Sequence, residues 1–179
     1  MIENPKGIFV STYRGHRFYP LAPSIDDVDI EDIAHGLAYQ CRFNGQTSSF
    51  YSVAQHSVLV ASIVPEHLRL PALLHDAAEA YLGDIVKPLK MLVPQFSHIE
   101  KQVAAIISEC FAVHELDHPL IKIADLVLLA TEKRDLMPNS VEPWASIAGV
   151  APLNAAIVAQ TPEQAKADFL ATWEAWRKC

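Results

Sequence analysis

Residues 70–83, LPALLHDAAEAYLG, carry the pattern on which the fold prediction depends. Side chains without charge recur there at the spacing of a helix that buries one face: Leu70, Leu73, Leu74, Ala77, Ala78 and Tyr81. Gly83 ends the helix. At about 100° per residue, His75, Asp76 and Glu79 share a second face, roughly opposite the first. The segment therefore predicts a buried helix that carries one imidazole and two carboxylates.

The polar face of this helix contains no basic residue. Solvated helix faces usually pair Lys with Glu at i, i+4, whereas carboxylates that crowd together without a cation repel one another. An imidazole beside carboxylate oxygens suits a divalent metal such as Zn²⁺, Mn²⁺, Co²⁺ or Fe²⁺. From this helix alone, a solvated surface and a metal site both remain open.

Two other segments offer further metal ligands. FYSVAQHSVLVASIV, residues 50–64, predicts a helix with His56 among apolar or small residues, and LIKIADLVLLATE, residues 120–132, places Asp125 between apolar neighbours. A histidine in such a helix is often only a hydrogen-bonded core residue, but a carboxylate in an apolar run must be paired, metal-bound or at a surface edge. Helical bundles build metal sites from side chains on facing helices, so we predict one centre shared by three helices.

A second metal-binding motif, H-E-x-x-H, occurs at His114, Glu115 and His118. In zinc proteases this motif lies on a helix, because the i, i+4 spacing brings both histidines to one face. Here Pro119 directly follows His118, and proline disfavours helical backbone in the residue before it. We therefore predict a polar loop between two helices at this position, and not a protease site.

The remaining sequence predicts an all-α chain with a short β appendage. IFVSTYRGHRFYPL alternates around Arg14 and Gly15, which indicates a hairpin. Asp29 caps a first helix, and Thr161 with Gln164 forms a capping box for the last one. We expect a single domain over 1–179, with the hairpin at about 8–20, the metal-binding helical core at about 30–137 and the C-terminal helix at about 162–177.

Composition limits the classes of function. The chain has 179 residues, of which 51% are hydrophobic, and a formal net charge of −7, which argues against nonspecific nucleic-acid binding because that relies on Lys and Arg. Cys41, Cys110 and Cys179 form no C-x-x-C pair and fit a reduced setting. The first residues lack signal-peptide features, and no apolar run approaches the roughly 20 residues of a membrane span. We expect a cytoplasmic protein that does not bind membranes.

The candidate ligands, in the order His56, then His75-Asp76, then Asp125, resemble those of the HD-domain metal-dependent phosphohydrolases. The stretches YSVAQHS, LLHDAAEAYLGDI and ATEKRDLM are similar to the small single-domain branch, which includes bacterial 5′-deoxynucleotidases and phage-type dATP triphosphohydrolases. The resemblance covers roughly residues 8–140. It implies an all-α, compact HD-domain helical bundle in which these four residues hold Co, Mn, Zn, Fe or Mg, with one or two ions per site.

The resemblance also assigns roles to two acidic residues. Glu79 matches a position that organises or deprotonates a water, and it lies one turn from His75 in the predicted helix. Asp84 matches a position that organises water or a second metal. A surface glutamate and a cap for the following turn are the structural alternatives for these two residues.

Cations would have to hold an anionic substrate on this acidic protein. Arg42 matches a catalytic arginine that grips a phosphate, and Lys87 and Lys90 would meet a phosphate tail, while Phe43 would stack on a base. A helix C-terminal arginine, solvated lysines and a core phenylalanine are the alternatives. These cations favour a deoxynucleoside triphosphate triphosphohydrolase with a dATP-like substrate. A 5′-deoxynucleotidase that releases phosphate from deoxynucleoside monophosphates is the alternative reaction.

The sequence supports three further expectations. Glu132, Arg134 and Asp135 are interpreted as an ionic cluster with a structural role, either behind the metal ligands or as a helix–helix pair. Because members of the resembling family form dimers or larger rings, we expect a homo-oligomer, either a dimer or a hexamer, in which Trp173 and Trp176 serve an interface or a core. A noncatalytic nucleotide sensor and a structural helical subunit are the alternatives to an enzyme.

Overall fold

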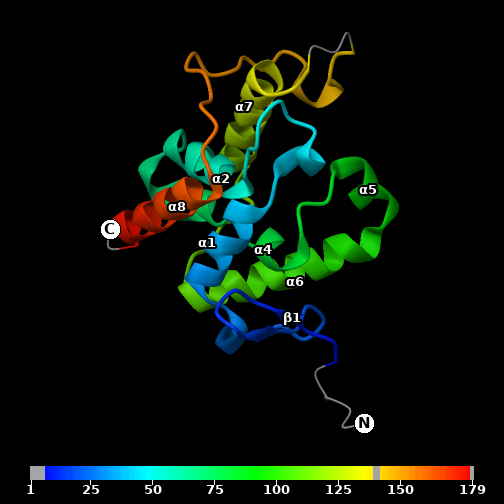
Figure 1. Cartoon of the computed structure of the whole chain (residues 1–179), viewed down its shortest axis with the longest axis vertical. Coiled ribbons are helices and arrows are strands. Elements are labelled where there is room, and N and C mark those ends of the chain that lie inside the picture. The colour runs from blue at the N-terminus through cyan, green and yellow to red at the C-terminus, as the bar shows by residue number, and fades with distance from the viewer. Residues whose placement is uncertain (1–6, 139–141, 178–179) are drawn as a thin grey trace.

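The chain is described by a computed structural model that covers residues 7–138 and 142–177. Within these residues, helices dominate, and two short strands form an antiparallel hairpin near the N-terminus. β1 (Val10–Ser11) pairs with β2 (Arg17–Phe18), with Val10 opposite Phe18. The expectation of a mostly helical chain with a short N-terminal hairpin is confirmed (Figure 1).

The helices pack around one apolar core. The α-helices are α1 (Ile30–Tyr39), α2 (Val53–Ser62), α3 (Arg69–Leu73), α4 (Glu79–Leu82), α5 (Lys87–Leu92), α6 (Pro94–Phe111), α7 (Pro119–Asp135) and α8 (Pro162–Trp176). Short 3-10 helices are η1 (Ile25–Asp27), η2 (Arg42–Gly45), η3 (Glu66–Leu68) and η4 (Ala145–Ile147). α8 packs against α1, α2 and α3, and α2 also packs against α7.

Side-chain caps set the predicted helix starts. The Asp29 carboxylate accepts from the backbone of α1, 2.7 Å away, and Thr161 and Gln164 form the predicted capping box of α8. The N-cap of α7 is His118, and Pro119 occupies its first turn. α2 begins only at Val53, later than the segment from residue 50 suggested, because the Ser52 hydroxyl caps it.

The predicted continuous helix over residues 70–83 is wrong in its middle. α3 ends at Leu73, residues 74–78 form turns, and α4 begins at Glu79. The backbone hydrogen bonds between these two helices join residues three apart, such as the N–H of Glu79 and the carbonyl of Asp76 at 2.9 Å. Helical spacing therefore does not fix which polar side chains of this segment share a face.

A histidine side chain provides the local reason for the interruption. Nδ1 of His75 lies 2.7 Å from the carbonyl oxygen of Ala72. In a regular α-helix that carbonyl would accept from the N–H of Asp76. The imidazole thus takes the place of a helical hydrogen bond, and the chain turns at the histidine-aspartate pair.

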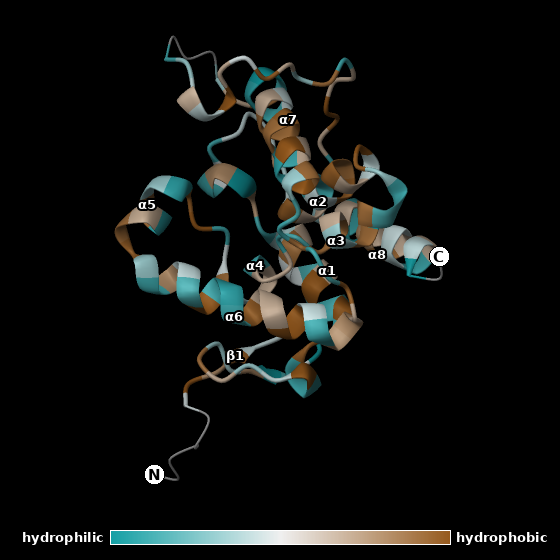
Figure 2. Cartoon of the chain, turned by 180° about the vertical axis from the view of Figure 1, so that it is seen from behind, coloured by the Kyte–Doolittle hydropathy of each residue, from teal (hydrophilic) through white to brown (hydrophobic). Residues whose placement is uncertain are grey.

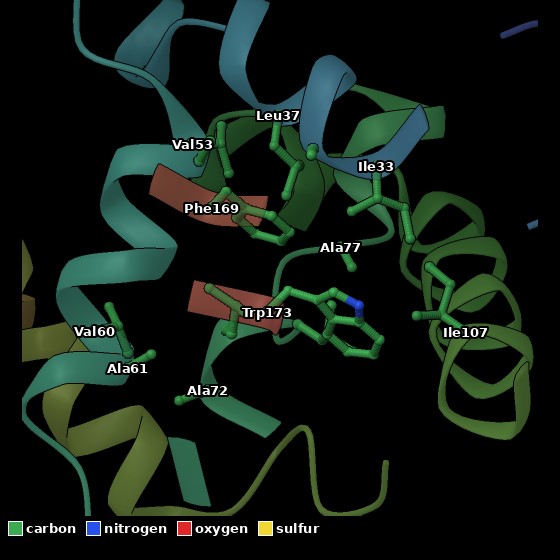
Figure 3. Close-up of a cluster of buried hydrophobic side chains, with 14 of the residues drawn as sticks. Ile33, Leu37, Val53, Val60, Ala61, Ala72, Ala77, Ile107, Phe169 and Trp173 are labelled. Carbon is green, nitrogen blue, oxygen red and sulfur yellow. The ribbon is translucent and has the colours of Figure 1, made fainter. Parts of the chain in front are cut away.

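The core lies where α1, α2, α6 and α8 meet. Figure 3 shows apolar side chains from these helices gathered around Phe169 and Trp173 of α8. Phe169 is fully buried, and the Trp173 ring packs edge-on against Phe111, with 4.9 Å between centroids. Trp176 lies partly buried against the same cluster. For Trp173 the core is therefore confirmed, whereas an interface role of Trp176 stays a prediction.

The two longest helices are amphipathic. Hydrophobic and hydrophilic residues alternate along α6 and α7 (Figure 2), and α6 buries Val103 and Ile107 while much of its remaining surface is exposed or half-buried. Within the described residues, no helix has both the length and the apolar character that crossing a membrane requires.

Candidate metal centre

The four predicted metal ligands meet at one point between α2, the turn after α3, and α7. One ligand atom each from His56, His75 and Asp125 lies within 4.8 Å of the others. Nε2 of His56 is 3.3 Å from Oδ1 of Asp125 and 3.6 Å from Oδ2 of Asp76. The same Asp76 oxygen is 3.2 Å from Nε2 of His75. Two imidazoles and two carboxylates therefore surround a common centre.

Both histidines present an unused nitrogen to this centre. Their Nε2 atoms are buried and make no hydrogen bond of regular geometry within the described structure, and their close neighbours there are the carboxylate oxygens of Asp76 and Asp125. Their Nδ1 atoms are occupied, by Oε1 of Glu132 at 2.6 Å for His56 and by the backbone oxygen of Ala72 at 2.7 Å for His75. A carbonyl oxygen only accepts, so Nδ1 of His75 is the donor in this bond and Nε2 is the nitrogen that faces the centre. Histidines that bind metals show this arrangement, and the residues fit a divalent cation.

The carboxylates of the centre are ionised. Burial raises the pKa of Asp76, but His75 and His56 outweigh burial and hold the pKa well below its usual range. Burial likewise raises the pKa of Asp125, and contact with His56 lowers it further than burial raises it. Two negative charges in a half-buried site attract a cation.

His56 carries the compensating proton when no metal is bound. Burial and the Arg42 guanidinium lower the pKa of its imidazole, but Glu132 and Asp125 outweigh them and raise it to about 9. At neutral pH the ring is therefore protonated in the metal-free chain. A divalent cation at the centre would replace this proton.

Glu132 holds two members of the site, which agrees with a structural role behind the ligands, although the sequence did not separate it from Arg134 and Asp135. Its side chain is fully buried and bonds both Nδ1 of His56 and, at 3.2 Å, Nη2 of Arg42. Glu132 follows Asp125 by seven residues, which is two helical turns, so both side chains lie on the same face of α7. That spacing was the signal in the sequence that could have found it.

Glu132, Arg134 and Asp135 do not form the single ionic cluster that was predicted from the sequence. Residues two apart on a helix do not face each other. Glu132 points into the site, whereas Arg134 pairs with Asp135 at the surface, where Nε and Oδ1 are 2.6 Å apart. The three charges therefore belong to two separate groups.

Arg42 reaches the centre from η2. It lies three residues beyond the end of α1, and not at the end of that helix as expected. Its guanidinium is largely buried and pairs with Glu132 at 3.2 Å and with Asp76 at 3.7 Å. The arginine is thus placed among the candidate ligands, where it balances part of their charge.

A strained turn orients the residues after Arg42. Phe43 and Asn44 both have left-handed backbone, with φ of 55° and 51°, followed by Gly45 at 72°. Successive non-glycine residues in this region are unfavourable and occur where the surrounding structure enforces them, often at functional sites. Phe43 is half-buried, and its ring lies 5.9 Å from that of Trp144. It is therefore not a core residue, and stacking on a base stays a prediction.

Glu79 and Asp84 lie close to the centre. Glu79 is buried, and its Oε2 atom has no hydrogen-bond partner within the described residues. Burial, and then the charges of Asp76 and Asp84, raise the pKa of Glu79 well above its usual range. The alternative that Asp84 caps the next helix is wrong, because the N-cap of α5 is Val86.

The two lysines occupy different environments. Lys90 is half-buried and pairs with Oε1 of Glu79 at 3.1 Å and with Glu100 at 2.7 Å. Lys87 is exposed at the start of α5. The expected phosphate contacts of both lysines stay predictions, and Lys90 already contacts two carboxylates.

The H-E-x-x-H motif lies apart from this centre, in the loop between α6 and α7. Glu115 has a left-handed φ of 63°, and Nδ1 of His118 accepts from the backbone of Leu120 at 3.1 Å. Within the described residues, metal-ligand spacing among three or more His, Cys, Asp or Glu occurs at His56, His75 and Asp125, and not at this motif. The predicted polar loop is confirmed.

Comparison with known proteins identifies relatives of the chain. A scan against models of known protein families finds no match. The chain is 42% identical over 142 residues to uncharacterized protein YfdR of Escherichia coli, an overlap of 79% of this chain and 80% of YfdR. The chain belongs to the YfdR family. A second relative, uncharacterized protein RCAP_rcc00048 of Rhodobacter capsulatus, is 38% identical over 136 residues, which are 68% of this chain and 69% of the relative.

In this member of the YfdR family, the side chains of the candidate centre could bind a metal, exchange a proton and contact an anion. Two imidazole nitrogens and two carboxylates suit a borderline divalent metal. The buried carboxylate of Glu79, whose pKa is raised by burial, binds a proton more readily than an exposed one. An arginine beside the ligands can meet an anionic group.

Proposed function

We propose that this YfdR-family chain is a metal-dependent phosphohydrolase of the HD-domain type that acts on (deoxy)nucleotide phosphate esters. The observation that supports it most strongly is the pair of buried, unpartnered Nε2 atoms of His56 and His75, which face the Asp76 and Asp125 carboxylates. This set matches the ligand order through which the sequence resembles that superfamily.

In the proposed reaction, four side chains would hold a divalent ion: His56, His75, Asp76 and Asp125. When bound, such an ion would lower the pKa of a water and draw charge from a phosphoryl oxygen. The unpartnered Oε2 of Glu79 would take a proton from the water that attacks the phosphorus, while the ester bond to the 5′ oxygen breaks and the deoxynucleoside leaves with a proton. Because burial raises the pKa of Glu79, its carboxylate binds a proton more readily than an ordinary glutamate does.

Arg42 would stabilise the negative charge that develops on the phosphate. Its two ion pairs hold the guanidinium beside the ligands, so that little reorganisation is needed when the substrate binds. The Phe43 ring, half-exposed on the same turn, would contact the base.

Triphosphates and monophosphates place different demands on this site. The triphosphate reaction, favoured from the sequence, needs positive charge for the β and γ phosphates. Arg42 already pairs with Glu132 and Asp76, and Lys90 with Glu79 and Glu100, which leaves Lys87 as the exposed member of the three expected cations. This distribution of ion pairs favours the alternative, a 5′-deoxynucleotidase, so both reactions belong in the test.

The test is turnover with defined products. The purified chain is incubated with dATP or with dAMP in the presence of Mn²⁺ or Co²⁺, and tripolyphosphate, phosphate and deoxyadenosine are quantified by chromatography. Release of tripolyphosphate or of phosphate supports the proposal and separates the two reactions. Binding of either nucleotide without turnover under any divalent ion would instead indicate a sensor and contradict the proposed function.

A further inference from the structure

We propose that Lys90 is a positioning residue of this site, and that its ammonium group holds one carboxylate oxygen of Glu79 so that the other can act in the metal centre. Nζ of Lys90 lies 3.1 Å from Oε1 of Glu79, while Oε2 is buried and has no hydrogen-bond partner within the described residues. The inference rests on the proposed function, in which Glu79 takes a proton from water.

Lys90 is itself held in place. Glu100 of α6 bonds Nζ at 2.7 Å, and the Phe96 ring lies 5.8 Å from it. The lysine side chain is 22% exposed and that of Glu100 is 26% exposed, so solvent screens this pair less than a surface ion pair. α5 lies at the periphery of the molecule beside α6 (Figure 1), and Lys90 joins it to α4.

The negative charges around Glu79 explain why its carboxylate needs the ammonium group of Lys90. Asp76 and Asp84 both oppose its ionisation, and the side chain is buried. Lys90 is the contacting group that favours the carboxylate form required of a base. Without it, a buried carboxylate would remain among like charges, which is costly.

The same geometry argues against Lys90 as a simple phosphate ligand. To bind a phosphate with its full charge, the ammonium would have to leave Glu79 and Glu100. The buried Glu79 would then lose its counter-ion while it is expected to act as a base. A positioning role keeps both ion pairs intact during the reaction.

The experiment compares Lys90→Met with Lys90→Arg, and with Lys101→Met as the matched control. Lys101 is an exposed lysine on α6, next to Glu100 in the sequence. kcat and KM are measured for both the monophosphate and the triphosphate, together with the affinity for Mn²⁺. Glu100→Gln, which keeps the size of the side chain, tests the second ion pair if Lys90→Met folds poorly.

We expect Lys90→Met to lower kcat about ten- to hundredfold for whichever nucleotide is turned over, with KM and Mn²⁺ affinity near those of the unmodified chain. Lys90→Arg should restore most of the loss because it retains the charge, and Glu100→Gln should lower kcat to a smaller extent. A rise in KM with unchanged kcat would show a phosphate ligand and overturn the inference, as would wild-type kinetics in Lys90→Met.

Hydrogen exchange gives a readout that is independent of turnover. Loss of the Lys90 ion pairs should speed amide exchange in α4 and α5, whereas Lys101→Met should leave both unchanged. If the unmodified chain hydrolyses no nucleotide but Lys90→Met still loosens α4, the proposed function is wrong and the link from Lys90 to Glu79 stands. Unchanged exchange in α4 would overturn the inference alone.

Discussion

At the scale of single residues, Asp76 connects both histidine ligands to Arg42. Its Oδ2 atom lies within 3.7 Å of His56, His75 and Arg42. We expect Asp76→Ala to abolish Mn²⁺ binding and turnover, because one ligand is lost and the arginine loses a partner. Isothermal titration calorimetry measures the binding.

His118→Ala is the control for this prediction. It removes a cap of α7, which costs about 0.5–2 kcal/mol of stability, but it touches no member of the centre. Its Mn²⁺ affinity should equal that of the unmodified chain. Equal loss of binding in both variants would contradict the assignment of the metal centre.

Glu132→Gln tests how the buried carboxylate supports His56. The amide keeps the volume but removes the charge that favours an Nδ1–H donor on His56 and that pairs with Arg42. Loss of such a partner typically costs 10–100-fold in metal affinity, and we expect a decrease of about that size. Competition with a chelator measures it; an affinity within twofold of the unmodified chain would show that Glu132 does not support the ligand.

Metal binding should release a proton from His56. The pKa of His56 is raised to about 9 in the metal-free chain, so the ring is protonated below that pH and must lose its proton to bind a cation. Affinity should therefore rise by about tenfold per pH unit up to about pH 9 and then level off. Calorimetry in buffers with different ionisation enthalpies measures the protons released. Affinity independent of pH between 6 and 8 would contradict this.

At the scale of elements, side chains of α7 and α2 hold the extended segment 151–160 against the helices. Asp135 accepts from the N–H of Ile157 at 2.8 Å, Arg134 donates to the carbonyl of Ala155 at 2.9 Å, and Gln55 donates to the carbonyl of Val158 at 2.8 Å. Gln55 immediately precedes His56 in the sequence, so the same helix, α2, holds this segment and carries a candidate ligand.

Asp135→Ala should loosen this segment. The variant loses the bond to Ile157 and leaves Arg134 without its carboxylate, so we expect a loss of about 1–2 kcal/mol in unfolding free energy and faster proteolysis within residues 151–160. Urea denaturation and limited proteolysis measure these effects. Asp117→Ala, an exposed aspartate that pairs with Lys122 at 3.7 Å, is the control; equal effects would contradict the role of Asp135.

The elements that were predictable from the sequence are those set by local signals. Asp29, Thr161 and the His118-Pro119 pair mark helix starts through capping and proline geometry, and the structure places the helices there. The break after Leu73 was not predictable from periodicity, because the apolar spacing continues through the turn. It depends on a side chain that bonds the backbone, which the hydrophobic pattern does not contain.

The sequence predicted which candidate ligands lie together, but it predicted fewer of the contacts that hold them in place. His56 and Asp125 were identified because a polar group in an apolar helix requires a partner. Glu132 was grouped with Arg134 and Asp135 because the three charges are close in the sequence, so its separate contact with His56 was not predicted. Lys90 contacts Glu100 because α5 packs against α6. No sequence pattern within α5 indicates this packing.

At the scale of the whole molecule, the core and the candidate centre share the same helices. α2 contributes Val53 and Val60 to the core and His56 to the centre, and both lie in the same ten-residue helix. The apolar packing thus fixes the relative positions of ligands that are distant in the sequence. The single domain and the homo-oligomer, dimer or hexamer, stay predictions, and sedimentation velocity would measure the second.

Pulsed electron paramagnetic resonance of the Mn²⁺-loaded chain tests the central claim most directly, because it detects nitrogen nuclei bound to the ion. We expect coupling of Mn²⁺ to two imidazole nitrogens. The number of coupled nitrogens should fall to one in His75→Ala and stay at two in His114→Ala. An ion that binds with no imidazole coupling, or a chain that takes up no Mn²⁺, would contradict it.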